Sequence, residues 1–249
     1  MLLRLAILFF TPIISGLLVF LFPQGRTRNF RLLLVFAGAY LFGITVVHIL
    51  PELFRNNAET ELIGLFVLVG FFLQQILEHV TSGIEHGHIH TDDHHHHHHG
   101  KPISAVFLLL ALCVHAFLEG AMLTQLEEIN LGYDINAILL GIVLHRTPAA
   151  FALMTVLVHQ LNSRTKALPY LLIFSLAAPA GLLVSSLLAE SSLLTASGLN
   201  LLYAVVSGNF LHISTTIVFE SSPEHKFNAR KLTVAILGAM MAVVIEYLM

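Results

Sequence analysis

The 249-residue chain carries too little charge for a soluble protein of its size. Charged residues make up 11% and hydrophobic residues 56%, with a mean hydropathy of +0.83, whereas soluble domains carry about 25% charged residues. Its single cysteine, Cys113, excludes an internal disulfide framework, and the formal net charge of −3 is uninformative without its distribution. We therefore expect an all-α, polytopic membrane protein.

Eight apolar stretches are long enough to cross about 30 Å of hydrocarbon, which takes roughly 17 to 25 helical residues. We expect the first to be a retained span rather than a signal peptide, because Pro12 and Gly16 interrupt it and no small-residue cleavage site follows. The connections are short, so we expect one transmembrane transporter domain over 1–249, an eight-helix bundle. The predicted spans are 5–22, 31–54, 62–80, 103–126, 135–160, 168–190, 198–219 and 232–249.

The distribution of basic residues predicts the orientation. Of the twelve Lys and Arg residues, nine follow the odd-numbered spans, whereas Arg55 is the one basic residue in the opposite connections. By the positive-inside rule the odd-numbered connections are cytoplasmic and both termini are outside. The nine are Arg26, Arg28, Arg31, Lys101, Arg164, Lys166, Lys226, Arg230 and Lys231.

The end of the second span is polar. Its last residues include His48, Pro51 and Glu52. Pro51 has no N–H to donate to the carbonyl of Val47, which leaves a polar notch beside His48. We expect His48 to line an ion pathway, and Glu52 is either a pathway residue or part of a capped helix end.

The connection 81–101 is predicted to be a histidine-rich cytoplasmic loop. Imidazoles suit Zn, Cu, Ni and Fe, and a flexible tract binds such ions without imposing one geometry. We expect a metal-collecting or metal-sensing loop; the alternative is an inserted purification tag. Its histidines are His86, His88, His90, His94, His95, His96, His97, His98 and His99. Interfacial solvation accounts for the polar residues that precede the loop, Gln74, Gln75, Glu78 and His79.

Candidate metal ligands occupy the fourth and fifth spans at the same depth. His115 and Glu119 are four residues apart and share one helix face. His145 lies near the middle of the next, antiparallel span, so the three side chains can meet near the midplane. Ionisable groups there cost at least about 2.5 to 3.5 kcal/mol each, so their presence indicates function. Pro148 removes a helical bond and predicts a kinked, partly unwound chain beside His145.

Two neutral imidazoles and one carboxylate bind metals at about 2.0–2.2 Å and suit Zn²⁺, with Fe²⁺, Mn²⁺, Co²⁺ and Cd²⁺ as alternatives. No cage of thiolates is present, which is expected if the ion must also be released. In the seventh span, Asn209 and His212 share a face and either line the pathway or bond between helices. A proline, Pro179, predicts a kink in the sixth span.

These motifs together resemble the ZIP (Zrt-, Irt-like) family of divalent-metal transporters along almost the whole chain. The resemblance implies an eight-helix bundle that moves Zn²⁺ or a related ion toward the cytoplasm, with His115, Glu119 and His145 at ligand positions. The histidine-rich loop also fits. The motifs are His115-x-x-x-Glu119-Gly120, His145-x-x-Pro148, His48-x-x-Pro51-Glu52, Pro179-x-Gly181 and Gly208-Asn209-Phe210-Leu211.

The chain departs from the family pattern at three positions. Many members have a polar residue where this chain has Ala116, and glutamates at the positions of Arg146 and Ala149. We therefore expect one ion at the centre rather than a bridged pair. Arg146 is a fixed cation that would repel a second divalent ion and could pair with Glu119 when no ion is bound.

The leading functional prediction is a transporter and not an enzyme, because midplane ligands and three proline-broken helices suit alternating access. An intramembrane zinc-dependent hydrolase with Glu119 as base is the alternative, although no His-Glu-x-x-His motif is present. A sensor or storage protein would not explain ligands at mid-membrane. We expect a divalent ion and the bilayer as partners, no nucleic acid, and either a monomer or a homodimer in the plasma membrane, or the inner membrane if bacterial.

Overall fold

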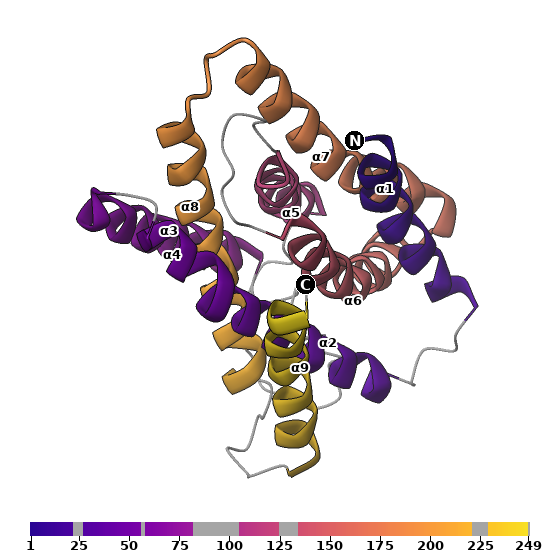
Figure 1. The fold of residues 1–249 in the computed structure, drawn as a ribbon. Coiled ribbons are helices and arrows are strands. Elements are labelled where there is room, and N and C mark those ends of the chain that lie inside the picture. Colours follow the sequence, from indigo (N-terminus) through magenta and orange to yellow (C-terminus); the bar gives the residue numbers. More distant parts are fainter. Residues whose placement is uncertain (22–26, 56–57, 82–104, 125–133, 221–228, 249) are drawn as a thin grey trace.

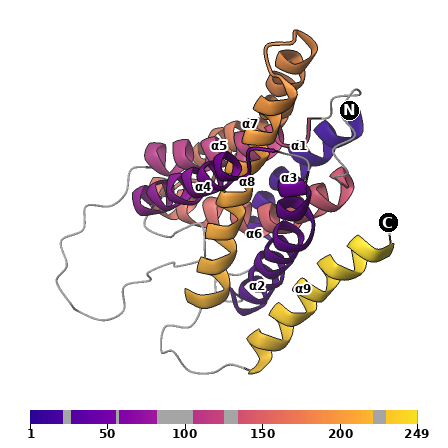
Figure 2. The same ribbon diagram turned by 60° about the vertical axis from the view of Figure 1, so that its left-hand side comes forward.

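The computed structural model describes residues 1–21, 27–55, 58–81, 105–124, 134–220 and 229–248 (Figures 1 and 2). Every regular element within these ranges is helical, as predicted. The α-helices are α1 (Leu2–Leu17), α2 (Thr27–Ile44), α3 (Leu50–Arg55), α4 (Thr60–Thr81), α5 (Ala105–Ala121), α6 (Ile135–Leu161), α7 (Arg164–Glu190), α8 (Ala196–Thr215) and α9 (Ala229–Leu248). A 3₁₀ turn, η1 (Leu18–Phe20), extends α1, and two π-helical segments, η2 (Thr45–Ile49) and η4 (Thr216–Glu220), follow α2 and α8.

Six helical stretches of the described chain are long and apolar enough to cross a membrane. The helices α5, with 17 residues, and α9, with 20, coincide with the spans predicted over 103–126 and 232–249, but neither is among the six. The six are Leu2–Phe20, Leu32–Arg55, Thr60–His79, Ile135–Leu161, Arg164–Glu190 and Ala196–Val218.

The prolines interrupt the helices less than the sequence suggested. Helix α1 continues through Pro12, α6 through Pro148 and α7 through Pro179. The predicted unwinding beside His145 is therefore wrong. Prolines are tolerated in membrane helices that pack among other helices. Beside Pro148, Thr147 Oγ1 donates to the Val143 carbonyl at 2.8 Å, whereas the carbonyl whose helical donor the proline removes is that of Leu144.

Pro51 is the exception, because the turn before it is irregular. Residues Thr45–Ile49 form the π-helix η2, which carries His48, and α3 continues from Leu50. Single π turns inside helices are frequent at functional sites. The predicted notch at the end of the second span is thus a local widening of the helix.

The helices pack as two groups (Figure 1). The first group comprises α1, α5, α6 and α7, and the second comprises α2, α4, α8 and α9, with η2 and α3 extending α2. Within a group, glycines bring backbones into contact. A Cβ atom at Gly120 of α5 would lie 1.9 Å from the Ala178 carbonyl oxygen of α7, and one at Gly70 of α4 would lie 1.9 Å from the Val205 carbonyl oxygen of α8. Small residues at such contacts favour close helix association in membranes.

Buried apolar residues form clusters that follow this division. One cluster joins α1, α5, α6 and α7 and includes Leu112, Leu153 and Phe174, so it belongs to the first group alone. A second, around Leu34 and Ile213, belongs to the second group. The third and largest cluster contains residues of both groups. The two groups therefore share one apolar core and each also has a core of its own.

Candidate metal centre

Two helices of the first group, α5 and α6, bring the three predicted ligands together. His115 and Glu119 lie one turn apart on α5, and His145 lies on α6. Each offers one ligand atom, and these atoms all lie within 4.8 Å of one another. The Nε2 atom of His115 is 3.1 Å from Oε1 of Glu119, and the two imidazole rings meet edge to face with centroids 5.7 Å apart. The predicted meeting of these side chains is therefore confirmed.

The group is buried. His115, Glu119 and His145 are 3%, 0% and 2% exposed. A buried carboxylate is stable only if it is paired with a cation or a metal, because the cost of removing its charge from water is large. Burial of these three ionisable side chains costs free energy of folding. This cost is expected where the side chains serve a function and do not only pack.

Arg146 supplies the positive charge. Its Nη1 atom lies 3.8 Å from Oε2 of Glu119, so the predicted pairing is present. The guanidinium is held from the other side by α7, where Nη2 donates to the Phe174 carbonyl at 3.3 Å and Cζ lies 4.9 Å from the Phe174 ring centroid. Arg146 is 2% exposed. Among these side chains, one negative charge thus faces one permanent positive charge.

Small residues let the helices approach at this depth. Ala116 and Ala150, beside the ligands on α5 and α6, are 1% and 0% exposed. Gly120 follows Glu119 directly and faces the α7 backbone. The sequence pattern of small residues around the ligands therefore fixes the distance between α5 and its neighbours.

The arrangement can bind a divalent ion with two nitrogens and one oxygen. This donor set suits Zn²⁺, and three protein ligands leave a position for water, as in sites that exchange what they bind. The described group contains a single carboxylate, and the guanidinium of Arg146 lies 3.8 Å from it.

His48, predicted to line the pathway, and Glu52, predicted as either a pathway residue or part of a helix end, are not among these three ligands. His48 is 7% exposed, and its Nε2 atom accepts a hydrogen bond from the backbone N–H of Asp134 at 2.9 Å. Glu52 lies 3.8 Å from Arg55, a partly exposed pair within α3, which agrees with the helix-end alternative. Asp134, which the sequence analysis did not single out, is the N-cap of α6; an aspartate before an apolar helical stretch is the signal that could have identified it.

Asn209 and His212 lie on α8 within the second group. Asn209 is 0% exposed. His212 Nε2 lies 2.5 Å from Oε2 of Glu78 on α4, and its ring packs on the edge of Phe71, with centroids 4.8 Å apart. For His212 the geometry is that of an interhelical bond, one of the two alternatives predicted.

The interfacial solvation predicted for the end of the third span is wrong at two residues. Gln74 is 0% exposed, and Glu78 is bonded to His212. The physical reason is that α8 covers this face of α4. The spacing of Gln74 and Glu78, one turn apart, was the available signal for a shared buried face. The histidines of the predicted loop, 86–99, lie outside the described residues.

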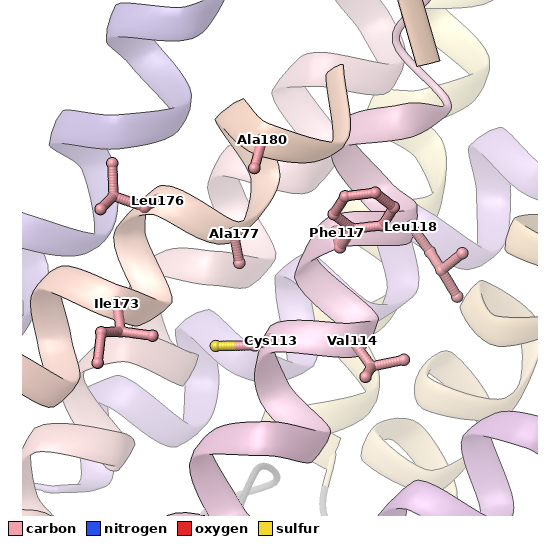
Figure 3. A pocket seen from close by; sticks show the side chains of 8 residues that line it. All are labelled: Cys113, Val114, Phe117, Leu118, Ile173, Leu176, Ala177 and Ala180. Carbon is pink, nitrogen blue, oxygen red and sulfur yellow. The ribbon is translucent and has the colours of Figure 1, made fainter. Parts of the chain in front are cut away.

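An apolar groove runs over α5 and α7 beside the centre (Figure 3). Its lining includes Cys113, Val114 and Phe117 from α5 and Leu176 and Ala180 from α7. Val114 and Leu176 are 37% and 48% exposed. The groove lacks nitrogen and oxygen side-chain ligands, so it is part of the outer apolar surface and not of the metal centre.

Fold and site together define an all-helical membrane protein with an internal metal-ligand cluster. A family model described as ZIP Zinc transporter matches residues 85–246, and the chain belongs to this family. It is therefore an integral membrane protein.

Individual proteins are also similar in sequence to parts of this chain. Zinc transporter ZIP9-A of Xenopus laevis is 29% identical over 163 residues, which cover 63% of this chain and 51% of the relative. Zinc transporter ZIP9 of Macaca fascicularis is 34% identical over 115 residues, 44% of this chain and 48% of the relative. Protein zntD of Dictyostelium discoideum is 28% identical over 149 residues, which cover 58% of this chain and 21% of the relative. The chain spans about half the length of the ZIP9 relatives it matches.

Proposed function

We propose that this protein transports Zn²⁺ across a membrane toward the cytoplasm, binding one ion at a time between His115, Glu119 and His145. The observation that carries the proposal is the buried group of three ligand atoms within 4.8 Å of one another on α5 and α6. The names of the ZIP9 relatives, which are zinc transporters, support the choice of ion. Fe²⁺, Mn²⁺, Co²⁺ and Cd²⁺ are alternative substrates that the same donor set would accept.

When the ion binds, it replaces Arg146 as the positive charge that faces the Glu119 carboxylate. An arriving ion takes the Glu119 carboxylate from Arg146, which keeps its contacts with Phe174 on α7. The histidines bind through neutral nitrogens, and a remaining position is left to water. When the ion leaves, Arg146 returns to Glu119, so the carboxylate is never buried without a partner.

The proposal includes the topology predicted from the sequence. It has eight spans, both termini outside, a single transmembrane domain over 1–249, and a cytoplasmic histidine-rich loop that receives the ion. The location is the plasma membrane, or the inner membrane if the source is bacterial, and the assembly is a monomer or a homodimer. In this scheme His48 and Asn209 lie along the pathway. Membership of a family described as zinc transporters supports transport over intramembrane hydrolysis.

Zinc uptake into proteoliposomes that contain the full chain tests this function. We expect His115→Ala and His145→Ala to abolish uptake, while His159→Ala, an exposed position on the same helix as His145, leaves it unchanged. Replacing the histidines of 86–99 by serine should preserve uptake, because the loop collects ions and does not form the site. Metal binding without flux, or uptake that survives His115→Ala, would overturn the proposal.

A further inference from the structure

Hydrogen bonds between described residues connect the two helix groups, among them one each from Tyr40, His48 and Tyr203. The Tyr40 hydroxyl on α2 donates to the Ala137 carbonyl on α6 at 3.0 Å, and the Tyr203 hydroxyl on α8 donates to the Thr124 carbonyl after α5 at 3.3 Å. His48 in η2 accepts from the Asp134 N–H at 2.9 Å. In each bond the side chain belongs to the second group and the backbone group to the first. We call them the interface hydrogen bonds.

All three lie at one end of the molecule. Thr124 follows the end of α5, and Asp134 and Ala137 belong to the start of α6. We call this end of the molecule the Asp134 end. Backbone groups at helix termini lack partners within their own helix, so Asp134 N–H and Thr124 C=O are groups that must find partners elsewhere. Residues of the opposite helix group satisfy them.

The apolar packing gives the same asymmetry. The core shared by both groups includes Leu41 and Ile44 from α2, Met122 after α5, and Ile138 and Ile142 from the first half of α6. The cores confined to one group use the opposite halves of the helices, such as Leu153 of α6 and Leu34 of α2. The two groups are therefore held together chiefly at the Asp134 end.

The interface bonds differ from the contacts inside each group. Inside a group, several glycines place backbone against backbone, among them Gly70, Gly120, Gly181 and Gly208; at Gly181 of α7 an added Cβ would lie 2.0 Å from the Phe117 carbonyl oxygen of α5. Gly16 and Gly38, also inside a group, meet side chains. Across the interface, Gly141 of α6 instead meets the side chains of Tyr40 and Leu41. Side-chain contacts can separate without distorting a helix, whereas interlocked backbones move as one body.

We propose that the interface hydrogen bonds of Tyr40, His48 and Tyr203 keep the Asp134 end closed, and that they break when the carrier opens to that side. The inference rests on the proposed transport function, because a carrier that alternates must open each end in turn. By the predicted orientation the Asp134 end is the outer one. The tyrosines are then positioning residues that set how often the carrier faces outward.

Labelling of a cysteine buried at the Asp134 end measures this opening directly. Ala137 is 2% exposed and bonds Tyr40 through its backbone, so Ala137→Cys keeps the bond in a Cys113→Ala background. The protein is held in lipid nanodiscs, where both ends meet solvent, and reacts with a bulky polar maleimide. Tyr40→Phe with Tyr203→Phe removes two hydroxyls and no apolar volume. Loss of two net hydrogen bonds should raise the labelling rate roughly five- to hundredfold.

Two controls separate opening from unfolding. Tyr247→Phe changes a tyrosine that is 83% exposed and should leave the rate unchanged. Ala167→Cys, 0% exposed in the core of the first group alone, should stay unlabelled in the double tyrosine variant. Labelling of Ala137→Cys at the parent rate, or equal acceleration at Ala167→Cys, would overturn the proposal. Zinc uptake by the parent is measured alongside; its absence would overturn the transport function, while unchanged labelling with uptake intact refutes the role of the bonds.

Discussion

Arg146 Nη1 lies 3.8 Å from Oε2 of Glu119, so the carboxylate of the metal centre faces a permanent cation. Two unit charges 4 Å apart attract each other by roughly 4 kcal/mol at an effective dielectric constant of 20. An ion that binds Glu119 must replace this attraction. In the proposed transport function, Arg146 therefore lowers the affinity of the site for the ion and, for the same reason, stabilises the protein when no ion is bound.

Arg146→Gln should tighten zinc binding and slow transport. Removal of the competing cation should raise the affinity for zinc by at least about tenfold. The corresponding free energy is a small part of the attraction between Arg146 and Glu119 that is lost. Turnover should fall, because release would leave Glu119 buried without its counter-charge. Zinc binding and uptake, measured on the same preparation, would show a lower Kd together with a lower maximal rate.

Arg146→Lys is the matched control. A lysine keeps the charge but not the planar contact with the Phe174 ring and carbonyl. It should retain most of the parent affinity. If the glutamine variant binds zinc no more tightly than the lysine variant, Arg146 does not compete with the ion.

The meeting of the three candidate ligands was predictable from the sequence, because it depends on spacing within one helix and on depth along the next. His115 and Glu119 share a face through their separation, and His145 follows from the midpoint of the next span. The bond between His212 and Glu78 was not predictable, because it joins positions 134 residues apart and depends on how α8 covers α4. Sequence spacing describes one helix at a time, whereas such pairs depend on packing between helices.

Pro148 shows a different limit. A proline removes one helical hydrogen bond, and the sequence alone favoured an unwound turn. In the structure, helix α6 is continuous over Ile135–Leu161 and includes Pro148. The Ser15 hydroxyl of α1 donates to the Thr147 carbonyl, and the Thr147 hydroxyl bonds within its own turn. Ser15 lies 132 residues from Thr147 in the chain, so this contact beside Pro148 depends on how α1 packs against α6, which sequence spacing does not describe.

Glu119→Gln should destabilise the protein as well as abolish uptake. Removing one member of a buried charge pair leaves the other uncompensated, which costs about 3 to 5 kcal/mol. Arg146 is that remaining charge. The midpoint of thermal unfolding in detergent should fall clearly below that of the parent.

The double variant Glu119→Gln with Arg146→Gln separates the two effects. Without either charge the midpoint should return toward that of the parent, because no buried ion is left alone. Zinc uptake should remain absent, since the carboxylate ligand is still missing. Recovery of uptake would show that Glu119 serves only to neutralise Arg146.

Uptake should fall steeply as the pH is lowered from about 8 to 5. Zinc binds neutral imidazole and ionised carboxylate, so protons compete with the metal for all three ligands. Initial rates at fixed free zinc, in vesicles with equal pH on both sides, test this. A flat profile would mean that His115 and His145 do not bind the ion.

The position of Glu119 should depend on the glycine beside it. A Cβ at Gly120 would lie 1.9 Å from the Ala178 carbonyl oxygen, far inside van der Waals contact. Gly120→Ala should therefore force α5 and α7 apart and move Glu119 relative to His145. Because misplacement of about 1 Å can cost a functional site a hundredfold, we expect at least a tenfold loss of uptake, with a lower unfolding midpoint.

Gly64→Ala in α4 is the appropriate comparison, since a Cβ there has no neighbour within 4 Å. Alanine is the better helix former by about 1 kcal/mol, so this change should leave stability unchanged or slightly raised and uptake intact. The two variants make the same chemical substitution inside a helix. Equal uptake by both would mean that close contact between α5 and α7 is not what places Glu119 at the metal centre.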